Sequence, residues 1–85
     1  MATVEIYTKA SCGFCVRAKR LLDMKKVEYR EIAVDGGGAP REEMLQRANG
    51  RSTVPQIFID GAHVGGCDAL MSLEYDGKLD ALLAA

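Results

Sequence analysis

Hydrophobic residues follow two different periodicities along the chain. Where they alternate with polar residues, or flank a turn, they predict four strands at about residues 4–7, 28–34, 56–59 and 63–64. Where they recur every three or four positions, they predict four helices at about residues 14–26, 40–48, 67–75 and 79–83. A strand–helix–strand unit joins parallel strands by a right-handed crossover, whereas hairpin strands are antiparallel. The order β-α-β-α-β-β-α-α therefore predicts an α/β fold with a four-stranded mixed sheet flanked by helices.

The same periodicity predicts which side chains face the core. The inner rows are expected to carry Phe14, Ala18, Leu21 and Leu22 on the first helix and Leu79, Leu82 and Leu83 on the last. Segment 35–38 contains three glycines, so it is expected to be a loop. His63 lies on the predicted hairpin, where we expect an exposed side chain.

Length and composition limit the class of protein. The 85 residues, 48% hydrophobic and 27% charged, suffice for a single domain over residues 1–85. A net charge of −1 gives no bulk attraction to nucleic acid or an anionic membrane, and no run approaches the ~20 apolar residues of a membrane span. The N-terminus lacks a signal-peptide pattern and the three cysteines are an odd count, so we expect a cytoplasmic protein without nucleic-acid or membrane partners.

The tetrad Cys12-Gly13-Phe14-Cys15 stands between the first predicted strand and the first predicted helix. Two thiols three residues apart can share one disulfide, and Cys12 lies where the helix dipole favours a thiolate. We therefore predict thiol–disulfide exchange with Cys12 as nucleophile and Cys15 as resolving thiol. A zinc site would need both of these cysteines together with His63 and Cys67, and a purely structural disulfide would need an oxidising compartment.

Three other segments could belong to the same site. Lys9 could stabilise a thiolate or bind an anionic group, but it could also be a solvated loop residue. Thr53-Val54-Pro55 precedes the third strand; a cis Pro55 would leave the backbone of Val54 free to pair with an extended peptide, and an ordinary trans proline is the alternative. Segment 65–68, Gly-Gly-Cys-Asp, opens a helix, so it could bind a carboxylate and an ammonium or could simply be a glycine bend with an Asp cap.

Together, the tetrad, Thr53-Val54-Pro55 and Gly65-Gly66-Cys67-Asp68 resemble the glutaredoxin family over essentially the whole chain, most closely its small bacterial dithiol members. The resemblance implies a thioredoxin fold, glutathione as the reducing co-substrate, and disulfide-bonded or glutathionylated proteins as partners. It places the glutathionyl sulfur on Cys12, with Cys15 resolving protein disulfides. It implies a glutathione site made of Lys9, Phe14, Arg41, Thr53, Val54, Pro55, Gly66, Cys67, Asp68 and Gln56.

The tetrad departs from the family's common Pro-Tyr pair, because Gly13-Phe14 stands between the cysteines. This pair resembles the monothiol branch, Cys-Gly-Phe-Ser, whose members bind a [2Fe–2S] cluster between two protomers with help from glutathione. The second interpretation is therefore a cluster-binding dimer that uses Cys12 as its protein ligand; without a cluster we expect a monomer with no metal ligand. A redoxin reduced by a flavoprotein is a third, disfavoured because no tryptophan precedes Cys12 and the 65–68 segment would have no purpose.

Overall fold

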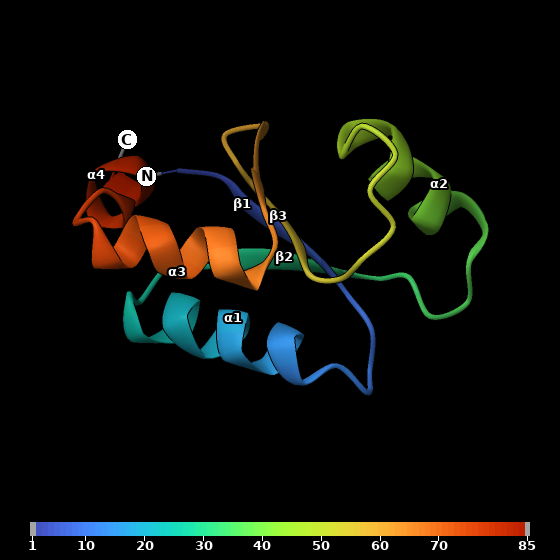
Figure 1. Ribbon diagram of the computed structural model, residues 1–85, viewed down its shortest axis with the longest axis horizontal. Coiled ribbons are helices and arrows are strands. Elements are labelled where there is room, and N and C mark those ends of the chain that lie inside the picture. Colours follow the sequence, from blue (N-terminus) through green and yellow to red (C-terminus); the bar gives the residue numbers. More distant parts are fainter. Residues whose placement is uncertain (1, 85) are drawn as a thin grey trace.

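The computed structural model describes residues 2–84 as one sheet with helices on both of its faces (Figure 1). The elements follow the predicted order: β1 (Val4–Thr8), α1 (Gly13–Met24), β2 (Tyr29–Ala33), α2 (Gly38–Arg47), β3 (Gln56–Ile59), β4 (Ala62–Gly65), α3 (Cys67–Tyr75) and α4 (Leu79–Ala84). The strands are arranged β2-β1-β3-β4, with β1 parallel to β2 and antiparallel to β3, and β3 antiparallel to β4. Within residues 2–84, no helix is both long and apolar enough to cross a membrane.

The central strand β1 is covered on both faces, so alternate residues enter two different cores. Val4 and Ile6 point into the larger core, beneath α1, α3 and α4. Tyr7 points into the smaller one, beneath α2. Figure 1 shows α1 and α3 side by side on one face and α2 apart from them on the other. The segment before β1 is tied to α4, because the N–H of Ala2 donates to the carbonyl of Leu83 at 3.2 Å.

Two predicted core residues lie on the surface. Phe14 is 56% exposed, and the inner row of α1 begins instead with Cys15, followed by Ala18, Leu21 and Leu22. The reason is that α1 starts at its cap, Cys12, so its third residue and not its second faces inward. Leu82 is 41% exposed on the short α4, where Leu79 and Leu83 make the buried contact.

Segment boundaries differ from the prediction by one or two residues. The hairpin turn is only Asp60-Gly61, both with positive φ (51° and 79°), because paired positive φ angles suit the twist of a two-residue hairpin. Helix α2 is assigned from Gly38, which the sequence placed in the loop, with Gly37 as its cap. His63 is half-buried, a correction to the predicted exposed position: its ring stacks on Phe58 with centroids 4.9 Å apart.

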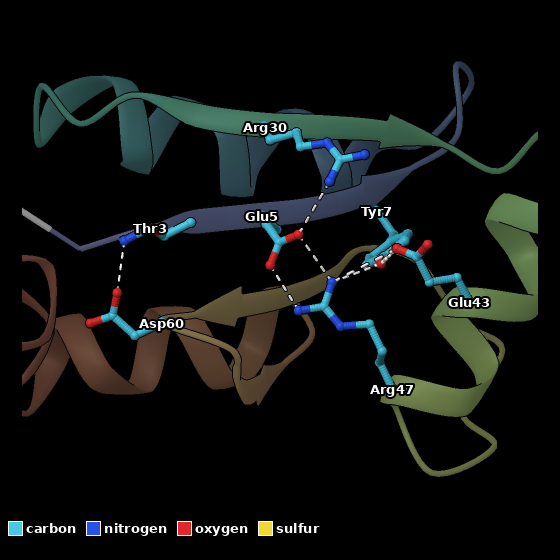
Figure 2. Close-up of polar contacts among 7 residues, drawn as sticks. All are labelled: Thr3, Glu5, Tyr7, Arg30, Glu43, Arg47 and Asp60. Carbon is cyan, nitrogen blue, oxygen red and sulfur yellow. Dashed lines mark hydrogen bonds and ion pairs between the residues drawn. The ribbon is translucent and has the colours of Figure 1, made fainter.

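A polar cluster ties α2 to the sheet, as Figure 2 shows. The guanidinium of Arg47 donates two hydrogen bonds to Glu5, at 2.7 and 3.1 Å, and a third to the Tyr7 hydroxyl at 2.8 Å. The Tyr7 hydroxyl in turn donates to Glu43. Arg47 also lies over the ring of Phe58, 4.1 Å from its centroid. A bidentate pair beside aromatic rings is partly shielded from water, so it fixes α2 more firmly than an exposed ion pair would.

This cluster predicts how Glu5 contributes to stability as the pH changes. The hydrogen bonds from Arg47 hold the pKa of Glu5 below its ordinary value. A carboxyl with a lowered folded-state pKa stabilises the protein above its unfolded pKa, and this contribution is lost as the pH falls through the folded value. In Glu5→Gln we therefore expect a lower free energy of unfolding near pH 7 and a shallower decline below about pH 4.5. Urea denaturation from pH 7 to pH 3 tests this; parallel curves for the variant and wild type would contradict it.

Candidate active site

The two thiols of the tetrad occupy different environments at the start of α1. Cys12 is the N-cap: its backbone is extended, and its sulfur accepts the N–H of Cys15 at 3.1 Å. Its thiol also donates to the carbonyl of Val54 at 3.7 Å. A cap sulfur that accepts a helix N–H is placed where a negative charge is stabilised. Cys12 is half-buried, whereas Cys15 is only 1% exposed.

Burial keeps Cys15 protonated at neutral pH. Desolvation is the main cause that raises the pKa of its thiol to about 12, followed by a hydrogen bond with Cys12, whereas the backbone of Lys9 acts in the opposite direction. A protonated thiol is a poor nucleophile. The two sulfurs are therefore chemically unequal: Cys12 is the accessible thiol, and Cys15 is a buried thiol next to it that stays protonated.

A cavity of about 440 Å³ lies beside Cys12. Its lining comes from three parts of the chain: α1, the segment before β3, and the start of α3. These residues are Phe14, Arg51, Thr53, Val54, Pro55, Gly66, Cys67, Asp68 and Ala69. The peptide bond between Val54 and Pro55 is cis. The lining therefore combines apolar surface with one cation and one anion.

Gly65 allows the start of α3 to approach the segment before β3, so that both can line the cavity. Gly65 has a φ of +119°, which a residue with a side chain rarely adopts. A Cβ on it would lie 3.1 Å from the Cβ of Ala69 and 3.4 Å from a guanidinium nitrogen of Arg51. The chain can therefore turn from β4 into α3 at this point while keeping Arg51 and Asp68 on the same cavity.

Seven of the ten residues predicted to bind glutathione line this cavity, and three do not. The seven are Phe14, Thr53, Val54, Pro55, Gly66, Cys67 and Asp68. Lys9 is exposed in the loop before α1, and Arg41 is half-buried on α2; neither is part of the lining. Gln56 is fully buried, and its amide bonds to Thr53 and His63 instead of facing the cavity.

Sequence reasoning missed two residues of the lining. Ala69 carries no chemical signal, and only the start of α3 brings it to the cavity. Arg51 gives only a weak signal, because it is a cation two positions before Thr53 in a segment whose sequence has no regular periodicity to predict where its side chain points. The zinc interpretation receives no support from the geometry: residues 2–84 hold no group of three or more His, Cys, Asp or Glu side chains placed to bind a metal ion.

Cys67 belongs both to the cavity and to the larger core. It is 5% exposed, and burial raises the pKa of its thiol, although the nearby Arg17 acts in the opposite direction. A buried, protonated thiol reacts slowly with alkylating reagents.

Alkylation of the folded protein should therefore be selective. With iodoacetamide at pH 7, we expect one rapid adduct, on Cys12, while Cys15 and Cys67 react only after unfolding. Mass spectrometry of timed samples measures this, with Cys12→Ser as the control that should gain no rapid adduct. Rapid double labelling of wild type would contradict the burial of the two inner thiols.

The chain is similar to known glutaredoxins along nearly its whole length. The family model described as Glutaredoxin matches residues 4–64. Glutaredoxin 3 of Escherichia coli strain K12 is 58% identical over 83 residues, which are 98% of this chain and 99% of that protein. Glutaredoxin 1 of Rickettsia felis is 54% identical over 82 residues, 95% of this chain and 80% of that one.

Solved structures agree with the sequence relatives. The solution structure of glutaredoxin from Brucella melitensis has a TM-score of 0.83 and 52% identity, covering 98% of this chain and 89% of that one. The crystal structure of a buckwheat glutaredoxin–glutathione complex has a TM-score of 0.85 and 36% identity, covering 98% and 77%. These matches confirm the predicted thioredoxin-like fold and the resemblance to bacterial glutaredoxin 3. This chain therefore belongs to the glutaredoxin family of thiol–disulfide oxidoreductases.

Proposed function

We propose that this protein uses glutathione to reduce protein disulfides and glutathione mixed disulfides, with Cys12 as the nucleophile and Cys15 as the resolving thiol. The observation that carries the proposal is the position of Cys12: it caps α1 and contacts Val54, a residue of the cavity wall. A disulfide bound in the cavity would lie next to the Cys12 sulfur at the start of α1. A solved relative with 36% identity is a complex with glutathione, which supports the choice of co-substrate.

The charges and backbone of the cavity suit a tripeptide that carries two carboxylates and one ammonium. Asp68 can accept from the ammonium of the γ-glutamyl group, and the N–H groups at the start of α3 can bind its carboxylate. Arg51 is the cation of the lining and can pair with the second carboxylate. In this proposal the cysteinyl part lies along Val54, and Phe14 covers it from the α1 side.

The reduction of a glutathione mixed disulfide needs only Cys12. Its thiolate attacks the glutathionyl sulfur, the Cys12–glutathione disulfide forms, and the substrate thiolate leaves and takes up a proton. The thiolate of a second glutathione then attacks the bound glutathionyl sulfur, so that glutathione disulfide leaves and Cys12 is regenerated. The reaction balances with one incoming glutathione: its sulfur is oxidised to a disulfide while the substrate sulfur is reduced to a thiol, and the transferred glutathionyl sulfur stays in a disulfide throughout.

A protein disulfide requires the second thiol. After attack by Cys12, the substrate protein remains joined to it through one sulfur. Cys15 then loses its proton and attacks the Cys12 sulfur, which releases the reduced protein and leaves a Cys12–Cys15 disulfide. Two glutathione molecules reduce that disulfide in turn. A reducing cytoplasm, the compartment expected from the sequence, would supply them.

The proposal predicts that the enzyme distinguishes glutathione from other small thiols through Asp68. With a glutathionylated peptide as substrate, we expect Asp68→Asn to raise KM about five- to tenfold, because one charged hydrogen bond to the substrate is lost, and to change kcat little. With the same peptide carrying a cysteine mixed disulfide, the KM of the variant should match that of wild type, because this substrate has no γ-glutamyl group to bind Asp68. Asp76→Asn is the matched control, since Asp76 caps the opposite end of α3. Equal KM increases for both substrates would argue against recognition of glutathione at this residue.

The [2Fe–2S] alternative rests on Gly13-Phe14 alone. The chain would supply Cys12, and all other ligands would have to come from a second chain and from glutathione, because residues 2–84 offer no ligand group of their own. The presence of Cys15 favours thiol–disulfide exchange, because the resolving step uses this second thiol. Anaerobic purification with glutathione tests the alternative: a brown dimer that loses its colour in Cys12→Ser would establish cluster binding, and a colourless monomer would exclude it under those conditions.

A further inference from the structure

Gln56 was expected to touch glutathione, but its side chain is held by a hydrogen-bonded chain behind the cavity. The side chain is fully buried. Its amide nitrogen donates to the carbonyl of Thr53 at 2.9 Å and to the Thr53 hydroxyl oxygen at 3.2 Å. Its amide oxygen lies 2.6 Å from Nε2 of His63. Both hydrogen-bonding ends of Gln56 are therefore occupied by the protein.

Simple chemistry determines the direction of each hydrogen bond. The carbonyl of Thr53 can only accept, so the NH₂ end of Gln56 must face it and the oxygen of the amide must face His63. His63 must then carry its proton on Nε2 and donate it. Burial, and then the charge of Arg51, lowers the pKa of His63, so a neutral ring with the proton on Nε2 meets this requirement at pH 7. The ring is held in place by its stacking on Phe58.

We propose that Gln56 is a positioning residue, which His63 orients and which holds Thr53, and through it Val54, in the wall of the substrate cavity. Segment 48–55 between α2 and β3 contains no regular element, so no helix or sheet ladder supports Thr53. The bonds from Gln56 provide the missing support from the first residue of β3. The carbonyl of Val54 accepts a hydrogen bond from the Cys12 thiol. The bonds from Gln56 therefore also help to fix the position of the cavity wall relative to the Cys12 sulfur. This inference deepens the proposed function and rests on it.

The first test replaces the amide with an apolar side chain of similar length. Gln56→Met keeps the buried volume but cannot donate to Thr53 or accept from His63. With a glutathionylated peptide as substrate, we expect KM to rise about five- to tenfold, because the wall that binds the substrate is less well held. We expect kcat to stay within about twofold, because the attacking Cys12 thiolate has no proton to donate to Val54. Ile57→Val is the matched control: it weakens the other core from the neighbouring position of β3 and should change neither constant.

A second readout separates this inference from the proposed function. The backbone order parameters of Thr53 and Val54, measured by ¹⁵N NMR relaxation, should fall from about 0.85 in Ile57→Val toward about 0.6 in Gln56→Met, because an unsupported loop moves more. This measurement needs no glutathione. If wild type fails to reduce the glutathionylated peptide, the proposed function is wrong, and the order parameters still decide whether Gln56 positions Thr53. Unchanged order parameters, or an unchanged KM in an active enzyme, would overturn the positioning role.

A third experiment restores the missing donor by a change of pH. In Gln56→Glu, an ionised carboxylate can accept from His63 but cannot donate to Thr53, whereas the protonated carboxyl can do both. The groups near this position are His63 of β4, Tyr7 opposite it on β1, Arg47 of α2 and Arg51 before β3. Glutathione is titrated by NMR into Cys12→Ser protein with and without Gln56→Glu, at pH 7.5 and pH 5. At pH 7.5 we expect the protein with Gln56→Glu to bind glutathione about fivefold or more weakly than the protein that keeps Gln56, and at pH 5 we expect the two affinities to be similar. If the ratio of the two affinities did not change with pH, donation to Thr53 would be contradicted.

Discussion

Cys12→Ser is expected to lower glutathione-dependent turnover at least about a thousandfold without unfolding the protein. Serine is a favoured N-cap, so its oxygen can accept the N–H of Cys15 as the sulfur does at 3.1 Å, and α1 keeps its start. The hydroxyl cannot form a disulfide, so the first chemical step has no nucleophile. Activity above about one per cent of wild type would show that another thiol can replace Cys12.

Cys15→Ser should separate the two substrates. Reduction of a glutathionylated peptide is expected to remain within about threefold of wild type, because only Cys12 takes part in it. Reduction of a protein disulfide should fall by about tenfold or more, because the intramolecular attack that releases the substrate is lost. Steady-state assays of both substrates with wild type and the two serine variants measure this. Equal losses on both substrates would contradict the resolving role of Cys15.

The raised pKa of Cys15 adds a pH dependence to the resolving step. Burial, the main cause of this raised pKa, is still present when Cys12 is joined to the substrate sulfur. Below the pKa of Cys15, its thiolate fraction rises about tenfold for each unit by which the pH is raised. In single-turnover reduction of a protein disulfide, the release step should therefore become faster from pH 7 to pH 9. Attack on a glutathionylated peptide by Cys15→Ser lacks this step and serves as the control.

Phe58→Ala is expected to cost about 3–5 kcal/mol of unfolding free energy, a large share of the ~5–15 kcal/mol that stabilises a typical protein. Phe58 belongs to the smaller core and is 1% exposed. It meets Tyr7 edge to face with ring centroids 5.7 Å apart, stacks on His63 and lies under Arg47. Removing its ring leaves a cavity and frees the cluster that holds α2. Because this domain has only 85 residues, each kcal/mol should lower Tm by about 4–8 °C.

Tyr75→Ala is the matched control for this prediction. Tyr75 is also aromatic, but it is 93% exposed at the end of α3, so its loss should change the unfolding free energy by less than about 0.5 kcal/mol. Thermal and urea unfolding followed by circular dichroism compare the two variants. If Phe58→Ala cost no more than Tyr75→Ala, the smaller core would not depend on this ring.

The secondary-structure elements and the family could be predicted from the sequence, because the patterns that indicate them involve residues close together in the chain. Hydrophobic periodicity depends on neighbours a few residues apart, so the order of all eight elements and the mixed sheet were predicted correctly. The three motifs that point to the family are equally local, and the comparisons confirm the family. Boundaries such as the start of α2 at Gly38 were less well predicted, because helix ends depend on caps that several residues can provide.

Tertiary structure decided the features that depend on contacts between distant segments. Whether Phe14 or Cys15 faces the core follows from how α1 docks on the sheet, and the orientation of Gln56 follows from the pairing of β3 with β4, which brings His63 to its amide. Arg51 and Ala69 join one cavity only because Gly65 lets two chain segments approach each other. Local patterns thus determined which elements form and which thiols stand at a helix start, whereas packing between elements determined which side chains share the cavity and which support it from behind.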